Sequence, residues 1–344
     1  MKKLLGYLSF LGIAFLLTSC TKTESDFTQA PESISISSDA TEVIAGGSVT
    51  FGVKSSLNNA FVTGDSKLFV NGVLITGNTY TFTQAGDFAV HAIKGSLTSN
   101  VISIKVVVNP SAGFVSRVLV EEYSGTWCGN CPTILYGVDL LHQQTDKAIV
   151  VSAHLFNGDP FITSQGNSLA ANLGITGVPS GKINRTTDWT GPQYENVPQV
   201  ISQIMPKASL GLAINSSVSG SNLSATISVS YAQPLTGSAK LTVYLVEDKL
   251  VYTQRNYSST LYAGQANIPG FEYNGVIRSV ISNLSGDAIA NNGAAVTKTY
   301  SASLPSNILN IANVKLVAFI TNDAGTVINV QEAKLGTLKN VEII

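Results

Sequence analysis

The chain has 344 residues, a formal net charge of -1 at pH 7 and 12% charged residues. This balance excludes an electrostatic basis for binding nucleic acid, which requires a basic surface. At about 100 to 200 residues per domain, the length predicts two or three domains. Alternating apolar residues recur over most of the chain, which indicates domains rich in β-structure.

The N-terminus has the pattern of a signal peptide, which we place at residues 1–19. Its apolar stretch, Leu4–Leu17, is too short to span a bilayer as a helix. The sequence Leu-Thr-Ser before Cys20 resembles a bacterial lipoprotein box, which implies a lipid on the Cys20 sulfur and a lipidated linker at 20–30. We therefore expect a lipid-anchored protein of the cell envelope, in the outer membrane and on either of its faces. The alternative is ordinary secretion with Cys20 left free.

Residues 31–109 alternate apolar and polar side chains with a period of two, as half-buried strands do. Asn71 and Gly72 stand between two apolar triplets, and this dipeptide suits a type I′ hairpin turn. We expect an immunoglobulin-like β-sandwich here, without the cysteine pair of true immunoglobulin domains. The following Asn-Pro-Ser-Ala-Gly, at 109–113, has the composition of a linker.

In residues 114–207 the pattern changes to alternating strands and helices. It predicts a strand at 117–123, a helix at 133–144, a strongly apolar strand at 147–156 and a further helix near 164–173. A strand, a crossover helix and a second strand form a βαβ unit, so the sheet should contain a parallel pair.

The run Thr-Trp-Cys-Gly-Asn-Cys-Pro occupies 126–132, between the first of these strands and its helix. Unpaired N–H groups and the helix dipole favour a thiolate there, so Cys128 is the predicted nucleophile and Cys131 the resolving thiol of a redox-active disulfide. The chain has three cysteines, and lipidation of Cys20 leaves this pair alone. Further zinc ligands are missing, and no metal or organic cofactor is implied. The alternative is a non-catalytic disulfide that staples the helix start.

The motif with its preceding Trp127 resembles the active-site approach of thioredoxins, and Gly-Val-Pro-Ser at 177–180 resembles their cis-proline loop. This resemblance implies a thioredoxin-like α/β domain at 114–207, with a cis bond between Val178 and Pro179. It also implies that these two residues and Trp127 contact an extended substrate. Together with the lipobox and the β-rich flanks, the motif resembles a family of thioredoxin-fold outer-membrane lipoproteins, the type named for a twenty-eight-kilodalton outer membrane protein.

Glu122 lies six residues before Cys128, where thioredoxins carry a buried acid. Burial would raise its pKa and suit it to exchange a proton with Cys131. The alternative is that Glu121 or Glu122 faces water at the strand end. His154, near the end of the second strand, could act as a base or be a hydrogen-bonded structural residue.

The period of two returns in residues 208–344, which predicts a C-terminal β-sandwich domain. A short helix with a loop is expected at 270–284. Neither β segment contains an acid–base pair or a glycine-rich phosphate loop. Their expected work is spacing, folding support or partner contact.

Two functions follow from these patterns. The first is an envelope lipoprotein with thiol-disulfide oxidoreductase activity, whose partners are exported protein thiols or disulfides and the membrane. The second is a non-catalytic outer-membrane binding or structural lipoprotein with a thioredoxin-like scaffold. Fold alone cannot choose between them.

Overall fold

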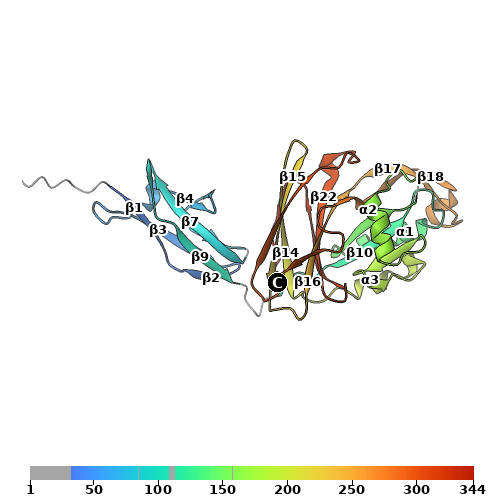
Figure 1. Ribbon diagram of the computed structural model, residues 1–344, viewed down its shortest axis with the longest axis horizontal. Coiled ribbons are helices and arrows are strands. Elements are labelled where there is room, and N and C mark those ends of the chain that lie inside the picture. Colours follow the sequence, from blue (N-terminus) through green and yellow to red (C-terminus); the bar gives the residue numbers. More distant parts are fainter. Residues whose placement is uncertain (1–31, 84, 108–112, 157) are drawn as a thin grey trace, which may run out of the picture.

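The computed structural model describes residues 32–83, 85–107, 113–156 and 158–344 (Figure 1). The predicted signal peptide, the lipidation site at Cys20, the lipidated linker at 20–30 and most of the linker at 109–113 lie outside these ranges. Strands dominate the described residues. None of the described helices combines the length and apolar content needed to cross a membrane.

The N-terminal residues fold into two sheets that enclose one apolar core (Figure 1). The three-stranded sheet has the order β1-β3-β6, and the six-stranded sheet has the order β2-β9-β7-β4-β5 with β8 on β7. Their bounds are β1 Ile34–Ser38, β2 Glu42–Ile44, β3 Ser48–Ser55, β4 Lys67–Val70, β5 Val73–Ile75, β6 Thr79–Thr81, β7 Gly86–Lys94, β8 Leu97–Thr98 and β9 Ile102–Val107, with a 3-10 turn η1 at Thr63–Asp65.

The predicted hairpin turn at Asn71-Gly72 is confirmed. Val70 of β4 pairs with Val73 of β5. Between them Asn71 has φ 48° and Gly72 has φ 79°, the pair of positive values that a type I′ turn requires.

The second part of the molecule is organised around a nine-stranded sheet of order β13-β12-β10-β11-β19-β16-β22-β23, with β20 on β16. Its members are β10 Val118–Ser124, β11 Ala148–His154, β12 Ser180–Ile183, β13 Thr187–Asp188, β16 Ala239–Glu247, β19 Val276–Val280, β20 Asp287–Ile289, β22 Val314–Thr321 and β23 Val327–Lys334. The β10–β11 pair is parallel, as the βαβ pattern predicts.

Two smaller sheets complete this part. A four-stranded sheet packs its apolar face against β16 and β22, and a two-stranded hairpin, β17–β18, lies at the helical end of the molecule (Figure 1). The bounds are β14 Leu210–Ser219, β15 Asn222–Tyr231, β21 Val296–Ser303, β24 Leu338–Lys339, β17 Leu250–Arg255 and β18 Asn267–Tyr273, with 3-10 turns η3 Leu261–Gly264 and η4 Ile311–Asn313.

Helices α1 (Pro132–Gln144), α2 (Ser164–Asn172) and α3 (Val197–Ile201), and the 3-10 turn η2 (Gln193–Glu195), cover the β10–β11 end of the sheet. α1 and α3 share an apolar cluster with Val118 and Val120 of β10, whereas α2 packs in a different cluster with β11 and β16. α1 begins at a proline, whose missing N–H costs nothing in a first turn.

The fold class predicted from the sequence is wrong in its central part. The described residues are nearly all β-sheet, with 24 strands and three α-helices. β10 to β13 do not make an α/β sheet of their own, because β11 pairs with β19 through Ser152 and Val276 and so continues into the C-terminal strands. A thioredoxin-like α/β domain at 114–207 is therefore not supported.

The short helix predicted at 270–284 is also wrong, since this region contributes β18 and β19. Asn274 and Gly275 stand between two runs of bulky residues, a sequence that suits two strands joined by a tight turn. Gly275 has φ 67° and an added Cβ would come within 2.4 Å of the Val150 oxygen, so glycine is required there.

An ion pair between Arg117 and Glu342 ties the start of β10 to the end of the chain. Burial alone would raise the pKa of Glu342, but hydrogen bonds from Lys339, Gln331 and Arg117 lower that pKa to about 2. A carboxyl with a lowered folded pKa stabilises the fold above its unfolded pKa, near 4.5, and loses this contribution as the pH falls toward 2.

We therefore expect Glu342→Gln to reduce the acid sensitivity of folding. The free energy of unfolding should fall less between pH 5 and pH 2 in the variant than in the parent, as measured by urea unfolding across that range. Asp65→Asn, an exposed carboxylate in η1, is the control and should keep the parent's pH profile. Parallel profiles for parent and Glu342→Gln would contradict the assignment.

Candidate functional site

The candidate site is the loop between β10 and α1, residues 125–131, which we call the cysteine loop. Cys128 and Cys131 are joined in a disulfide, and Cys131 is the residue immediately before α1. The loop is tightly wound, because the Cys128 N–H donates to the Gly125 carbonyl at 3.1 Å and the Cys131 N–H donates to the Cys128 carbonyl at 3.2 Å. Cys131 is fully buried and Cys128 is only 4% exposed, so the predicted nucleophile is not open to solvent.

One side of the cysteine loop is anchored by Asp159, a buried carboxylate. Its two oxygens accept hydrogen bonds from the Thr126 N–H at 2.7 Å and the Phe161 N–H at 2.9 Å, and His154 Nδ1 lies 3.0 Å from Oδ1. Burial would raise the pKa of Asp159, but the hydrogen bonds from His154, Phe161 and Thr126 lower it. His154 thus holds the loop's anchor, in line with the structural alternative considered for it.

The other side of the loop is covered by residues 254–257, which we call the covering segment. The Arg255 N–H donates to the Thr126 carbonyl at 2.8 Å and the Tyr257 N–H to the Gly129 carbonyl at 2.7 Å. Between them the buried Gln254 amide donates to the Cys128 carbonyl at 2.9 Å and accepts from the Tyr273 hydroxyl at 2.7 Å. The backbone carbonyls around the disulfide are therefore hydrogen-bonded to the covering segment.

The Tyr257 ring lies directly on Gly129, and a Cβ at position 129 would come within 2.4 Å of that ring. The Arg255 guanidinium lies over the same ring, 5.0 Å from its centroid. Tyr257 itself is 63% exposed, so its ring forms an outer cover on the motif.

Trp127 and Phe156 form an exposed aromatic pair next to the disulfide. Their rings meet edge to face with centroids 5.4 Å apart, and they are 43% and 49% exposed. The Trp127 indole N–H donates to the Leu155 carbonyl at 3.2 Å, which fixes the ring. This pair presents an exposed apolar surface close to the cysteines, where substrate contact was predicted for Trp127.

Glu122 is 3% exposed and its Oε1 has no hydrogen-bond partner. Burial raises its pKa, and the charge of His154 and the hydroxyls of Ser124 and Ser152 oppose this rise. Neither hydroxyl is hydrogen-bonded to Oε1. The neighbouring Glu121 is 1% exposed and is paired with Arg185 and the Tyr244 hydroxyl. The alternative that one of these acids faces water is therefore wrong.

Val178 and Pro179 immediately precede β12, and the bond between them is cis, as expected. Since Ser180 pairs with Tyr123 near the end of β10, this loop lies at the same end of the sheet as the cysteine loop. Both residues are half-buried. The described residues contain no group of three or more His, Cys, Asp or Glu arranged to hold a metal ion.

Sequence reasoning missed the covering segment. Gln254, Arg255 and Tyr257 stand more than 120 positions after the motif that they contact. A period-two strand pattern at 250–255 gives no local sign of this pairing. Asp159 was also missed, although a carboxylate five residues after His154 was the available signal.

The family model described as Outer membrane protein Omp28 matches residues 166–339, about half of the chain. With the β-rich fold, this match defines an outer membrane protein of the cell envelope, as the sequence predicted for its location. The chain belongs to the Omp28 family. The matched region includes the covering segment but begins after the cysteine loop.

Among solved structures, HBP35 of Porphyromonas gingivalis is similar to this chain, with 17% identity, a TM-score of 0.51, and coverage of 65% of this chain and 77% of that chain. A DUF4785 family protein of Legionella pneumophila has 8% identity, covers 88% of this chain and 55% of its own, and has a TM-score of only 0.19. The first likeness concerns the fold alone. A search of curated proteins finds no match.

These comparisons overturn the resemblance inferred from the sequence. The matching family is described as an outer membrane protein, and neither it nor HBP35 provides evidence of a thioredoxin. The assignment to a thioredoxin-like lipoprotein family is therefore wrong. The prediction of a whole thioredoxin-like domain relied on short motifs, Cys-x-x-Cys and a nearby Gly-Val-Pro, which do not define a fold.

We expect Asp159→Asn to destabilise the protein by about 1–3 kcal/mol, because the amide offers one acceptor where the carboxylate offers two, and its NH2 would face a backbone N–H. Urea unfolding of the oxidised protein measures this loss. Asp65→Asn removes an equal charge from an exposed position and should stay within about 0.5 kcal/mol of the parent. Equal stability of the two variants would mean that Asp159 does not anchor the loop.

Proposed function

We propose that this Omp28-family protein is a binding or structural protein of the outer membrane, whose Cys128–Cys131 disulfide is closed off by its own chain. The supporting observation is the covering segment. It bonds to the carbonyls of Thr126, Cys128 and Gly129, and Cys128 retains only 4% exposure. A thiolate that attacks a disulfide needs access to one of its sulfurs, and the burial of both cysteines limits this access.

A second candidate function, thiol-disulfide exchange with exported proteins, is favoured by a different observation. The disulfide stands at the start of α1, where free N–H groups and the helix dipole stabilise a thiolate. In addition, a carboxyl without a partner for Oε1, Glu122, is buried on the face of β10 that α1 covers. A disulfide that only staples a helix has no need of such a group, whose burial is costly.

In this second function a client thiolate attacks the Cys128 sulfur, the Cys128–Cys131 bond breaks, and Cys131 leaves as a thiolate that takes up a proton, for which Glu122 is the proposed donor. A second client thiolate then attacks the client sulfur of the mixed disulfide and releases Cys128. The client gains a disulfide and the protein is reduced to the dithiol. Trp127, Val178 and Pro179 would contact the client. A lipid on Cys20 would hold the protein at the membrane.

Exchange of this kind requires the covering segment to leave first. Its two backbone hydrogen bonds, from Arg255 to Thr126 and from Tyr257 to Gly129, contribute about 0.5–1.5 kcal/mol each. The segment is thus a cover of modest strength.

An insulin-reduction assay with dithiothreitol separates the two functions. With the full-length protein in detergent, the closed disulfide predicts equal rates for the parent and Cys128→Ser, since neither presents a reactive sulfur. A parent rate more than about tenfold above that of Cys128→Ser would overturn the first proposal and support exchange. Both proteins retain Cys20 in the same state, so any contribution of Cys20 is equal in the two rates.

Opening of the cover is measured separately. Tyr257→Ala should speed the reduction of Cys128–Cys131 by dithiothreitol about fivefold, the equivalent of about 1 kcal/mol of lost closing energy, as read by alkylation and mass spectrometry. Tyr252→Ala is the matched control, because Tyr252 is an exposed tyrosine of the adjoining strand β17 whose ring contacts Phe161 and not Gly129. Reduction of Tyr257→Ala at the parent rate would show that the ring does not close the site.

A further inference from the structure

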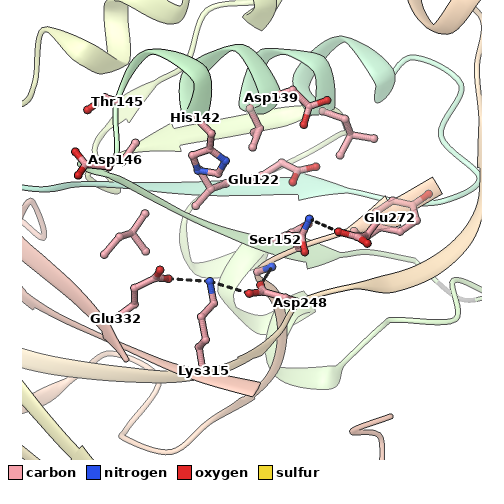
Figure 2. Close-up of a pocket in the computed structure, with 18 of the residues that line it drawn as sticks. Glu122, Asp139, His142, Thr145, Asp146, Ser152, Asp248, Glu272, Lys315 and Glu332 are labelled. Carbon is pink, nitrogen blue, oxygen red and sulfur yellow. Dashed lines mark hydrogen bonds and ion pairs between the residues drawn. The ribbon is translucent and has the colours of Figure 1, made fainter. Parts of the chain in front are cut away.

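A pocket of about 390 Å³ lies between α1, β11 and the β17–β18 hairpin (Figure 2). This volume is within the range of about 300–1,000 Å³ that ligand pockets occupy. No residue of the cysteine loop or of the covering segment lines it. The pocket is therefore a separate feature from the disulfide.

The polar lining of this pocket is strongly acidic. It contains six carboxyl side chains and a single lysine (Figure 2): Glu122, Asp139, Asp146, Asp248, Glu272, Glu332 and Lys315. Lys315 Nζ lies 3.0 Å from both Asp248 and Glu332, so its charge is already paired with these two carboxylates. The histidine of the lining is His142, whose pKa is lowered by burial and by the charge of Lys315, so that its neutral form is favoured. Apart from Lys315, the lining therefore offers carboxyl groups and no further cation, and burial raises the pKa of Glu122 and of Asp139, which favours their neutral forms.

Glu122 and Ser152 lie at the inner end of the pocket, opposite each other on β10 and β11. They are 3% and 2% exposed, and both Glu122 Oε1 and Ser152 Oγ lack a hydrogen-bond partner. Glu122 Oε1 is a buried acceptor, and the Ser152 hydroxyl beside it can donate or accept. Leaving both without a partner costs free energy that a bound polar group would recover. Figure 2 shows them beneath α1, with Asp139 above.

The groups that face Glu122 come from each surrounding element. Asp139 of α1 adds to the rise of the Glu122 pKa that burial causes, whereas His154 of β11 opposes it. Burial raises the pKa of the hydroxyls of Tyr273 of β18 and Tyr262 of η3, and the nearby Glu122 adds to the rise. His154 is the one basic side chain among these groups, and its Nδ1 is bonded to Asp159.

Part of the wall is apolar. Leu135 and Val138 of α1, Val150 of β11 and Phe271 of β18 also line the pocket. Such a wall accommodates methylene groups, while an acidic inner end attracts a cation. A compact ammonium with three donors can bond to Glu122 Oε1 and Ser152 Oγ together.

We propose that this pocket binds an aliphatic primary amine, with its ammonium at Glu122 and Ser152 and its methylene chain along Leu135, Val138 and Phe271. A lysine side chain of a peptide and a free diamine share this chemistry. The inference goes beyond the proposed function, because it concerns a site that the disulfide does not line.

Isothermal titration calorimetry on the full-length, oxidised protein tests the proposal with two probes, Nα-acetyl-lysine methylamide and pentane-1,5-diamine. We expect at least one probe to bind with a Kd below about 1 mM. Glu122→Gln should weaken that binding at least tenfold, and Glu272→Gln, at the exposed entrance, about twofold to threefold. Asp65→Asn, far along the chain in η1, should leave the Kd unchanged.

Proton release gives a second readout. An ammonium beside Glu122 brings the raised pKa of that carboxyl down, so binding should release protons and the measured heat should depend on the buffer's ionisation enthalpy. Binding of the lysine derivative alone identifies a peptide side chain as the ligand, and binding of both probes extends it to free amines. Either result supports the amine site.

Three results would overturn the proposal: no binding of either probe at about 10 mM, equal affinity of the parent and Glu122→Gln, or equal affinity for the uncharged Nα-acetyl-norleucine methylamide. Glu272→Gln changes only an exposed side chain, so its weaker binding cannot be ascribed to misfolding. Because the disulfide stays oxidised throughout, the outcome is independent of whether Cys128 and Cys131 exchange.

Discussion

The parallel register of β10 and β11 is the constraint on which the rest of this end of the molecule depends. It sets Glu122 opposite Ser152 and Ser124 opposite His154, on the face that α1 covers. Four buried polar side chains therefore lie on the face where α1 packs against Val118 and Val120. The burial that raises the pKa of Glu122, and its place in the wall of the acidic pocket, follow from this pairing.

The local elements of this region could be predicted from sequence, and their assembly could not. The helix after the cysteines and the apolar strand that follows it were found from periodicity, and α1 and β11 lie at those positions. The error was to close the sheet within residues 114–207. Periodicity reports which face of a strand is buried, but it does not report the neighbour that buries it, and Ser152 finds Val276 more than a hundred residues later.

The same limit applies to the candidate site. The two cysteines were identified from residue types and spacing, and Glu122 and the cis Val178–Pro179 bond from the resemblance to thioredoxins; the structure places them at one end of the sheet. The burial of Cys128 was not foreseen, because the residues that bury it lie in a β-hairpin with no chemical motif of its own. A motif read in isolation predicts the chemistry that a group can perform, whereas tertiary contacts decide whether the group is accessible.

Gly129, between the two cysteines, has a consequence for how this protein can vary. The Tyr257 ring occupies the space where a side chain at position 129 would begin. The choice of residue inside the motif is thus coupled to a tyrosine in a distant hairpin. A larger residue at position 129 would need a smaller one at position 257, so the two should change together wherever the disulfide stays covered. A bulky residue at position 129 beside a retained tyrosine would displace the ring and open the disulfide.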